Sequence, residues 1–249
     1  MKAILITLSA LILLSCTNEV KYDYDSKVYQ KNQAKSKKEI AKDYLALRHR
    51  ILDKKARFKY EYNKANSQKK KSLEVLANKY IHKTITDTIF PYWYDTKWDY
   101  NGTTEYPQNG NIACGYFVTT TLKHAGFNLQ RVKLAQQASS KIIETICGRG
   151  TAHIIGNNDT ERLKEYMLGQ KNGIYIIGLD NHVGFIWKSD TTLRAVHSNG
   201  VSGSMKVVNE PIESCKLINK SKAFYIGDLK KNKSLYKNWI TGKSIKTVL

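Results

Sequence analysis

The sequence predicts an α+β fold in which helices come first and an antiparallel sheet follows. Apolar residues recur at helical spacing in the first part of the 249-residue chain, whereas short apolar runs separated by turn residues prevail after residue 172. Residues 89–249, a block of ~160 residues, are enough to bury an adequate core. We therefore expect helices packed on an antiparallel sheet in this block.

Residues 1–16 are expected to be a signal peptide and not part of the fold. A single Lys2 precedes an apolar run, Ala3 to Leu14, that is too short to cross a membrane. The run ends in Leu13-Leu14-Ser15-Cys16, which resembles a bacterial lipobox. The resemblance implies that Cys16 is lipidated and anchors the protein in the cell envelope, outside the cytoplasm. An ordinary secretory signal cut nearby is the alternative, and the choice between a periplasmic-facing and an outer-membrane location stays open.

Residues 17–88 differ from the rest in charge. Sixteen Lys or Arg stand against four acids between Lys27 and Lys71, which accounts for +12 of the formal net charge of +20. Apolar residues recur at helical spacing from Ile40 to Ile51 and again from Leu73 to Tyr80, so we expect a mostly helical, basic tether or stalk. It is expected either to contact anionic lipid or wall polymer or to pack on the following domain. A nucleic-acid partner is not expected, because no nucleic-acid-binding motif accompanies the charge.

The elements after residue 88 can be placed in order. A helix is expected from Cys114 to Gly126, another from Val132 through about Cys147, and a third starting near Asn158 or Asp159. Strands are expected over five short apolar runs, at 173–179, 181–187, 193–198, 205–208 and 223–227. The basic end of the chain is expected to cover the sheet edge or to trail.

Three residues in these elements have the chemistry of a thiol enzyme. Cys114 would lie at a helix N-terminus, where unpaired N–H groups and the helix dipole favour a thiolate. His182 starts one predicted strand and His197 ends the next, so antiparallel pairing could bring the imidazoles together. A nucleophilic thiol needs a base, and the base needs a third group to fix its tautomer. Cys114, His182 and His197 supply these roles in that order, although Asn199 is an alternative third member.

The same residues resemble the NlpC-type, papain-like cell-wall peptidases. The resemblance runs from about Trp93 to Val208 and rests on the stretch 95–104 before Cys114, on His182-Val183-Gly184-Phe185-Ile186 and on Val196-His197-Ser198. Cys114-Gly115-Tyr116-Phe117-Val118 is also similar to the related CHAP amidases. Ala113 stands where the family often has Asp, Gly115 where it has Ser, and Trp98 where it places a substrate-site Tyr.

The resemblance implies a papain-like catalytic domain at 89–249 that hydrolyses amide bonds, most simply in peptidoglycan stem peptides. Cys114 would be the nucleophile, His182 the base and His197 its orienting partner, without a cofactor. Trp98 and Tyr100 would bind substrate. They belong to an aromatic run from Phe90 to Tyr100, which we expect to be either a stacking platform or a wall of the core. The alternatives are a catalytically inactive wall-binding lipoprotein and an amidase or acyltransferase acting on another substrate.

The cysteine count fits one reactive thiol outside the cytoplasm. Without Cys16 the chain keeps Cys114, Cys147 and Cys215, so at most one disulfide can form, and a Cys147–Cys215 pair stays open. None of the spacings gives a CxxC pair, so we expect no zinc site.

Overall fold

The computed structural model describes residues 26–249, and the expected signal peptide and Cys16 lie outside the described residues. The strands are β1 (His153–Ile155), β2 (Gly173–Leu179), β3 (His182–Lys188), β4 (Leu193–Asn199), β5 (Lys206–Pro211) and β6 (Phe224–Asp228). The helices are α1 (Lys27–Gln33), α2 (Lys37–Lys64), α3 (Ser67–Thr84), the π-helical turn η1 (Ile85–Ile89), α4 (Phe90–Trp93), α5 (Cys114–His124), α6 (Arg131–Ala135), α7 (Ser139–Cys147), α8 (Thr160–Leu168), η2 (Ile212–Ser214), α9 (Lys216–Lys220), η3 (Leu229–Lys231) and α10 (Leu235–Thr241).

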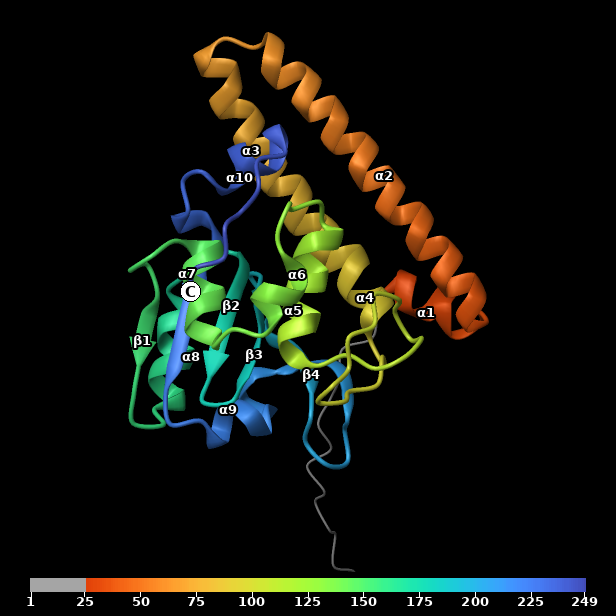
Figure 1. Cartoon of the computed structure of the whole chain (residues 1–249). Helices are drawn as coiled ribbons and strands as arrows, with labels where there is room; N and C mark the ends of the chain where they lie inside the picture. Colours follow the sequence, from red (N-terminus) through yellow and green to blue (C-terminus); the bar gives the residue numbers. More distant parts are fainter. Residues whose placement is uncertain (1–25) are drawn as a thin grey trace, which may run out of the picture.

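The strands form one antiparallel sheet in the order β1-β6-β2-β3-β4-β5 (Figure 1). The α+β class predicted from the sequence is therefore confirmed, as are the five predicted strands. The sequence analysis missed β1, which has only three residues and pairs with β6 at the sheet edge. It also ended the strand predicted at 205–208 too early, because β5 begins at Lys206 and continues to Pro211.

Alternation along the strands divides the apolar residues between two cores, one on each face of the sheet. Ile174 and Ile176 of β2 belong to the larger core, with α5 and α7, whereas Tyr175 and Ile177 face a smaller core under α8 and α9. Cys147 lies in the larger core and Cys215 in the smaller one, and both are free thiols. The pairing that the sequence left open is therefore absent.

The helix predicted at Cys114 is α5, and it ends as expected before Gly126, whose φ of 98° is a conformation that glycine adopts without strain. The helix predicted from Val132 to Cys147 is in fact two helices, α6 and α7. Ala138 has extended backbone and begins α7 as its N-cap residue. The helix predicted near Asp159 is α8, and the Asp159 side chain accepts a hydrogen bond from the Arg162 amide in the expected capping role.

The basic segment is helical, as predicted, and its apolar stripe belongs to the larger core. Ile40, Tyr44 and Ile51 of α2 and Ile81 of α3 are each no more than 2% exposed. These side chains lie in the same cluster as residues of α5, α10 and the sheet. Of the two alternatives left open for this segment, burial therefore favours packing on the following domain.

The C-terminal helix α10 does not trail but packs between the long helices and the rest of the domain. Phe58 of α2, Tyr80 of α3 and Trp239 of α10 make mutual ring contacts, with centroids 5.6–6.1 Å apart. The Trp239 indole N–H also donates to the carbonyl of Ala125, just after α5. Helix α10 thus connects the basic segment to the helix that carries Cys114.

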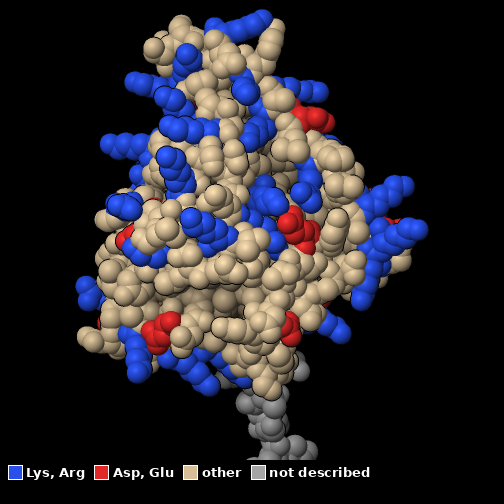
Figure 2. Space-filling view, in the orientation of Figure 1, with Lys and Arg blue, Asp and Glu red and all other residues tan. Residues whose placement is uncertain are grey.

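Lys and Arg dominate the exposed side of the long helices, and few acidic side chains accompany them on the face shown in Figure 2. None of the helices in the described part of the chain has the length and apolarity that a membrane crossing requires.

A buried polar chain fixes α2 against α5. The Tyr44 hydroxyl lies 3.0 Å from His124 Nδ1 and accepts a 2.8 Å hydrogen bond from the Trp93 indole N–H. His124 Nε2 lies 3.2 Å from Glu105, in the loop before Cys114. Burial, followed by the positive charge of Arg48, lowers the pKa of His124 to about 3, so its imidazole is neutral. These polar contacts therefore join neutral hydroxyl, indole and imidazole groups to the Glu105 carboxylate at one end.

Removal of the Tyr44 hydroxyl tests whether the basic segment is structurally part of the domain. Tyr44→Phe leaves the Trp93 N–H and His124 without their shared buried partner, which should lower the free energy of unfolding by about 1–3 kcal/mol. Tyr60→Phe, on the exposed side of α2, is the control and should change it by less than about 0.5 kcal/mol. Urea unfolding followed by circular dichroism measures both free energies. Equal stability of the two variants would contradict a structural role of the basic segment in the domain.

Candidate active site

Cys114 is held by the strand-like segment that leads into α5. The Ala113 amide donates to the carbonyl of Gly102 at 2.8 Å, and the Ile112 amide donates to that of Lys97 at 2.9 Å. The buried Ser198 hydroxyl of β4 donates to the Ile112 carbonyl at 2.6 Å. The segment before Cys114 is thus fixed to the sheet through Ile112, and the first turn of α5 starts at the cysteine itself.

Two glycines make room around this position. A Cβ on Gly115 would come within 2.3 Å of the Ala135 carbonyl oxygen, so only glycine lets α5 approach the end of α6 here. This close approach explains why glycine follows the cysteine. A Cβ on Gly184 would come within 2.7 Å of the His197 Cβ, so the glycine of the His182-Val183-Gly184 motif gives His197 its place on the sheet face.

The structure brings the two predicted histidines into direct contact. His182 Nε2 lies 2.9 Å from His197 Nδ1, and the two rings meet edge to face. His182 is half-buried at the start of β3, whereas His197 is 2% exposed. Asn199, the alternative third member, instead accepts a hydrogen bond from the Val201 amide at 2.8 Å. His197 is therefore the residue that contacts the candidate base.

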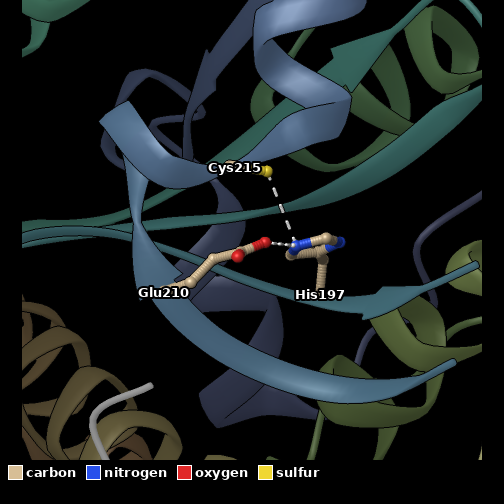
Figure 3. Close-up of side chains that lie close together, drawn as sticks. All are labelled: His197, Glu210 and Cys215. Atoms are coloured by element: carbon tan, nitrogen blue, oxygen red, sulfur yellow. Dashed lines mark hydrogen bonds and ion pairs between the residues drawn. The ribbon is translucent and has the colours of Figure 1, made fainter. Parts of the chain in front are cut away.

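Glu210 and Cys215 extend the site and were not predicted from the sequence. His197 Nε2 lies 2.8 Å from Glu210 Oε1, and Cys215 Sγ lies 3.6 Å from the same nitrogen (Figure 3). Both residues are at most 2% exposed. Glu210 is on β5 two positions from Val208, which pairs with His197, so carboxylate and imidazole are diagonal neighbours across the sheet.

One group of side chains in the described part of the chain could hold a metal ion. It consists of His197, Glu210 and Cys215, whose possible ligand atoms lie within 4.8 Å of one another. A metal at His197 Nε2 would need that nitrogen's lone pair. The 2.8 Å separation from Glu210 is instead that of an N–H···O hydrogen bond. We therefore interpret the cluster as a hydrogen-bonded group in which His197 carries a proton on Nε2. The expectation of no zinc site stays a prediction.

Cys114 and His182 line one pocket of about 700 Å³ at the end of the sheet. The turn between β2 and β3 forms one wall, and Trp98 and Tyr100 form part of another. The Trp98 amide donates to the Met205 carbonyl at 2.9 Å, and its ring packs on Gly200. The aromatic run is thus divided between its two predicted roles. Residues 90–94 are buried in the core, whereas Trp98 and the 80% exposed Tyr100 face the pocket.

The sulfur and the two imidazoles have shifted proton affinities. Burial raises the pKa of the Cys114 thiol, and the backbone N–H groups of Val183, Gly115 and Cys114 itself reduce this effect without reversing it. The N–H groups at the helix start thus favour the thiolate in the expected direction, but burial outweighs them. Burial and the neighbouring His197 together hold the pKa of His182 well below its ordinary value, so this imidazole is neutral.

His197 has the opposite shift. Burial alone lowers the pKa of His197, but Cys215 and the Glu210 carboxylate outweigh it and raise the pKa to about 9. At neutral pH the site therefore holds a thiol, a neutral imidazole and an imidazolium paired with a buried carboxylate.

Comparisons of the chain with protein-family models, with curated proteins and with solved structures find no match.

The shift of His197 can be measured directly by NMR titration of the imidazoles. We expect one site imidazole to titrate near pH 9 and the other below pH 6.5. Glu210→Gln removes the charge that favours the imidazolium, so the upper value should fall, while Glu213→Gln, an exposed glutamate nearby, should leave it unchanged. An upper value that is the same in both variants would show that Glu210 does not hold the proton on His197.

Proposed function

We propose that the protein is a thiol hydrolase that cleaves amide bonds through Cys114, His182 and His197, with Glu210 as a positioning residue. The observation that carries the proposal is the 2.9 Å contact between His182 Nε2 and His197 Nδ1 beside a pocket that also contains Cys114. This contact leaves His182 Nδ1 as the nitrogen available to the thiol. The order of nucleophile, base and orienting group is that of other thiol and serine hydrolases.

The shifted pKa values suggest how the thiol loses its proton. His182 alone is a weak base, because its pKa lies well below 6.5. If His197 has lost its Nδ1 proton, however, His182 can accept the thiol proton at Nδ1 while its Nε2 proton passes to His197 Nδ1. The positive charge then rests on His197 beside Glu210, whose carboxylate is 2.8 Å away. The proton thus ends on the imidazole with the higher affinity, and Cys114 becomes a thiolate without leaving an imidazolium next to it.

The thiolate would attack the substrate carbonyl, forming an acyl-enzyme when the amine leaves. The return of the proton through His197 and His182 supplies the amine with the hydrogen that it needs. Water then cleaves the acyl-enzyme by the reverse path. The resemblance to NlpC-type and CHAP enzymes favours peptidoglycan stem peptides as substrate, bound against Trp98 and Tyr100. The lipobox-like end of the signal peptide, at Cys16, favours a lipid-anchored protein of the cell envelope.

Substitution of the nucleophile tests the reaction. Cys114→Ala should reduce the release of new amines from purified muropeptides by more than about a thousandfold, because it removes the one thiol among the residues that line the pocket. Cys147→Ala removes a buried thiol from the core and serves as the control, expected to keep activity in its folded fraction. Mass spectrometry of the products identifies the bond cleaved. Full activity of a folded Cys114→Ala protein would exclude this mechanism.

The relay also predicts an unusual pH dependence. The imidazolium form of His197 blocks proton transfer, and a raised pKa keeps it protonated to higher pH, so kcat/KM should rise with pH to a midpoint at about 9. In Glu210→Gln the midpoint should move down towards the ordinary imidazole value of about 6.5. A profile that is flat between pH 6 and 9, or a midpoint that Glu210→Gln does not move, would contradict the relay.

A further inference from the structure

A second pocket, of about 990 Å³, lies at the other end of the β2–β3 hairpin. Its walls come from α3, from the start of β2, from the end of β3 and from the chain between η3 and α10. Strands β2 and β3 have seven residues each, so this pocket and the Cys114 pocket are separated by roughly 20 Å along the sheet. It shares no lining residue with the candidate active site.

The charge in this second pocket is almost entirely positive. Seven lysines from all of its walls line it, namely Lys71, Lys79, Lys83, Lys171, Lys188, Lys230 and Lys233, against a single acid, Glu74. The Glu74 carboxylate accepts a hydrogen bond from Tyr62, and Lys83 is paired with Asp87. The other six lysines form no ion pair among the described residues, so the pocket has a large uncompensated positive charge.

Two of these lysines are held in place by the fold. Lys230 Nζ donates to the Asn172 carbonyl at 2.7 Å. Lys188 is 9% exposed, and its Nζ has only the Asn172 side-chain oxygen, at 3.5 Å, as a partner. The same Asn172 amide donates to Asp190 at 2.7 Å, but Lys188 forms no direct ion pair among the described residues, and an anion in the pocket would supply one. A solvated charged face does not require such a buried, unpaired lysine.

The pocket also offers a neutral surface. Half-buried Trp187 and buried Tyr236 contribute to its walls. Burial and the neighbouring Lys230 lower the pKa of His82 to about 4, so this residue is neutral, and its Nε2 lies 3.0 Å from the Tyr236 hydroxyl. A ligand that fills this space therefore has an uncharged part as well as its anionic groups. Lysines act as compact point charges that bind phosphate groups well.

We infer that the pocket between α3 and the β2–β3 hairpin binds a phosphate-bearing organic anion, with its phosphate among Lys188, Lys230 and Lys233. The volume exceeds that of one phosphate and is typical of a small-molecule site. Such a group could come from a soluble phosphate compound or from a lipid headgroup that enters the pocket.

The test measures binding of two probes to the full chain at physiological salt. Pyrophosphate, followed by calorimetry, represents a free phosphate compound. Sedimentation with phosphatidylcholine vesicles that contain phosphatidic acid represents a lipid phosphate. Lys230→Gln combined with Lys233→Gln should weaken binding of the relevant probe at least tenfold. Lys37→Gln combined with Lys38→Gln, which removes two exposed charges of α2 outside the pocket, should weaken it less than twofold.

The result identifies the source of the phosphate or rejects the site. Selective loss of pyrophosphate binding indicates a soluble ligand, and selective loss of vesicle binding indicates a lipid headgroup. If the double variant in the pocket does not fold, Lys79→Gln combined with Lys171→Gln, both exposed lining residues, takes its place. Equal weakening by pocket and control variants, or no binding of either probe by the unaltered chain, would overturn the inference.

Discussion

The site depends on a line of polar groups that crosses one face of the sheet. His182, His197 and Glu210 come from three successive strands, and each contacts the next at 2.8–2.9 Å. Antiparallel register makes Glu210 a diagonal neighbour of His197, and Gly184 leaves the space that the His197 side chain occupies. Because the inner members of this line are buried, every donor and acceptor in it must be satisfied within the sheet, and a one-residue slip of β4 would break both contacts.

This arrangement separates two tasks that a single imidazole usually combines. In the proposed reaction His182, which lines the pocket, exchanges protons with the thiol, but burial and the neighbouring His197 give it little affinity for a proton. His197 lies deeper and has the affinity, because Cys215 and Glu210 outweigh the cost of burial. Between them the two rings can pass a proton over a short distance without placing a lasting positive charge beside the cysteine. Cys215 and the buried Glu210 carboxylate are together the source of that difference in affinity.

The sequence predicted those features that depend on residue patterns within a single helix or strand. The helix at Cys114 and the strands that carry His182 and His197 have their own apolar patterns, so both the elements and the three residues could be found. Glu210 follows Val207, Val208 and Asn209, all of which are buried, so no alternation marked it as an inward-facing charge. Its partner is 13 residues away in the chain and is revealed only by strand register. Cys215 lies beyond the end of β5, where no periodic pattern predicts its direction.

The basic segment shows why composition alone could not fix its role. Its lysines indicate a solvated surface, but Tyr44 and Ile51 join the same core as α5, and α10 closes over Phe58 and Tyr80. Because helix α3 is part of this core, its lysines keep a fixed position relative to the sheet and do not move on a flexible tether. The β2–β3 hairpin then has the thiol site at one end and the lysine-lined pocket at the other, on a rigid spacing of roughly 20 Å. A molecule with one end bound in the second pocket would therefore reach Cys114 only with a part that lies roughly 20 Å from that end.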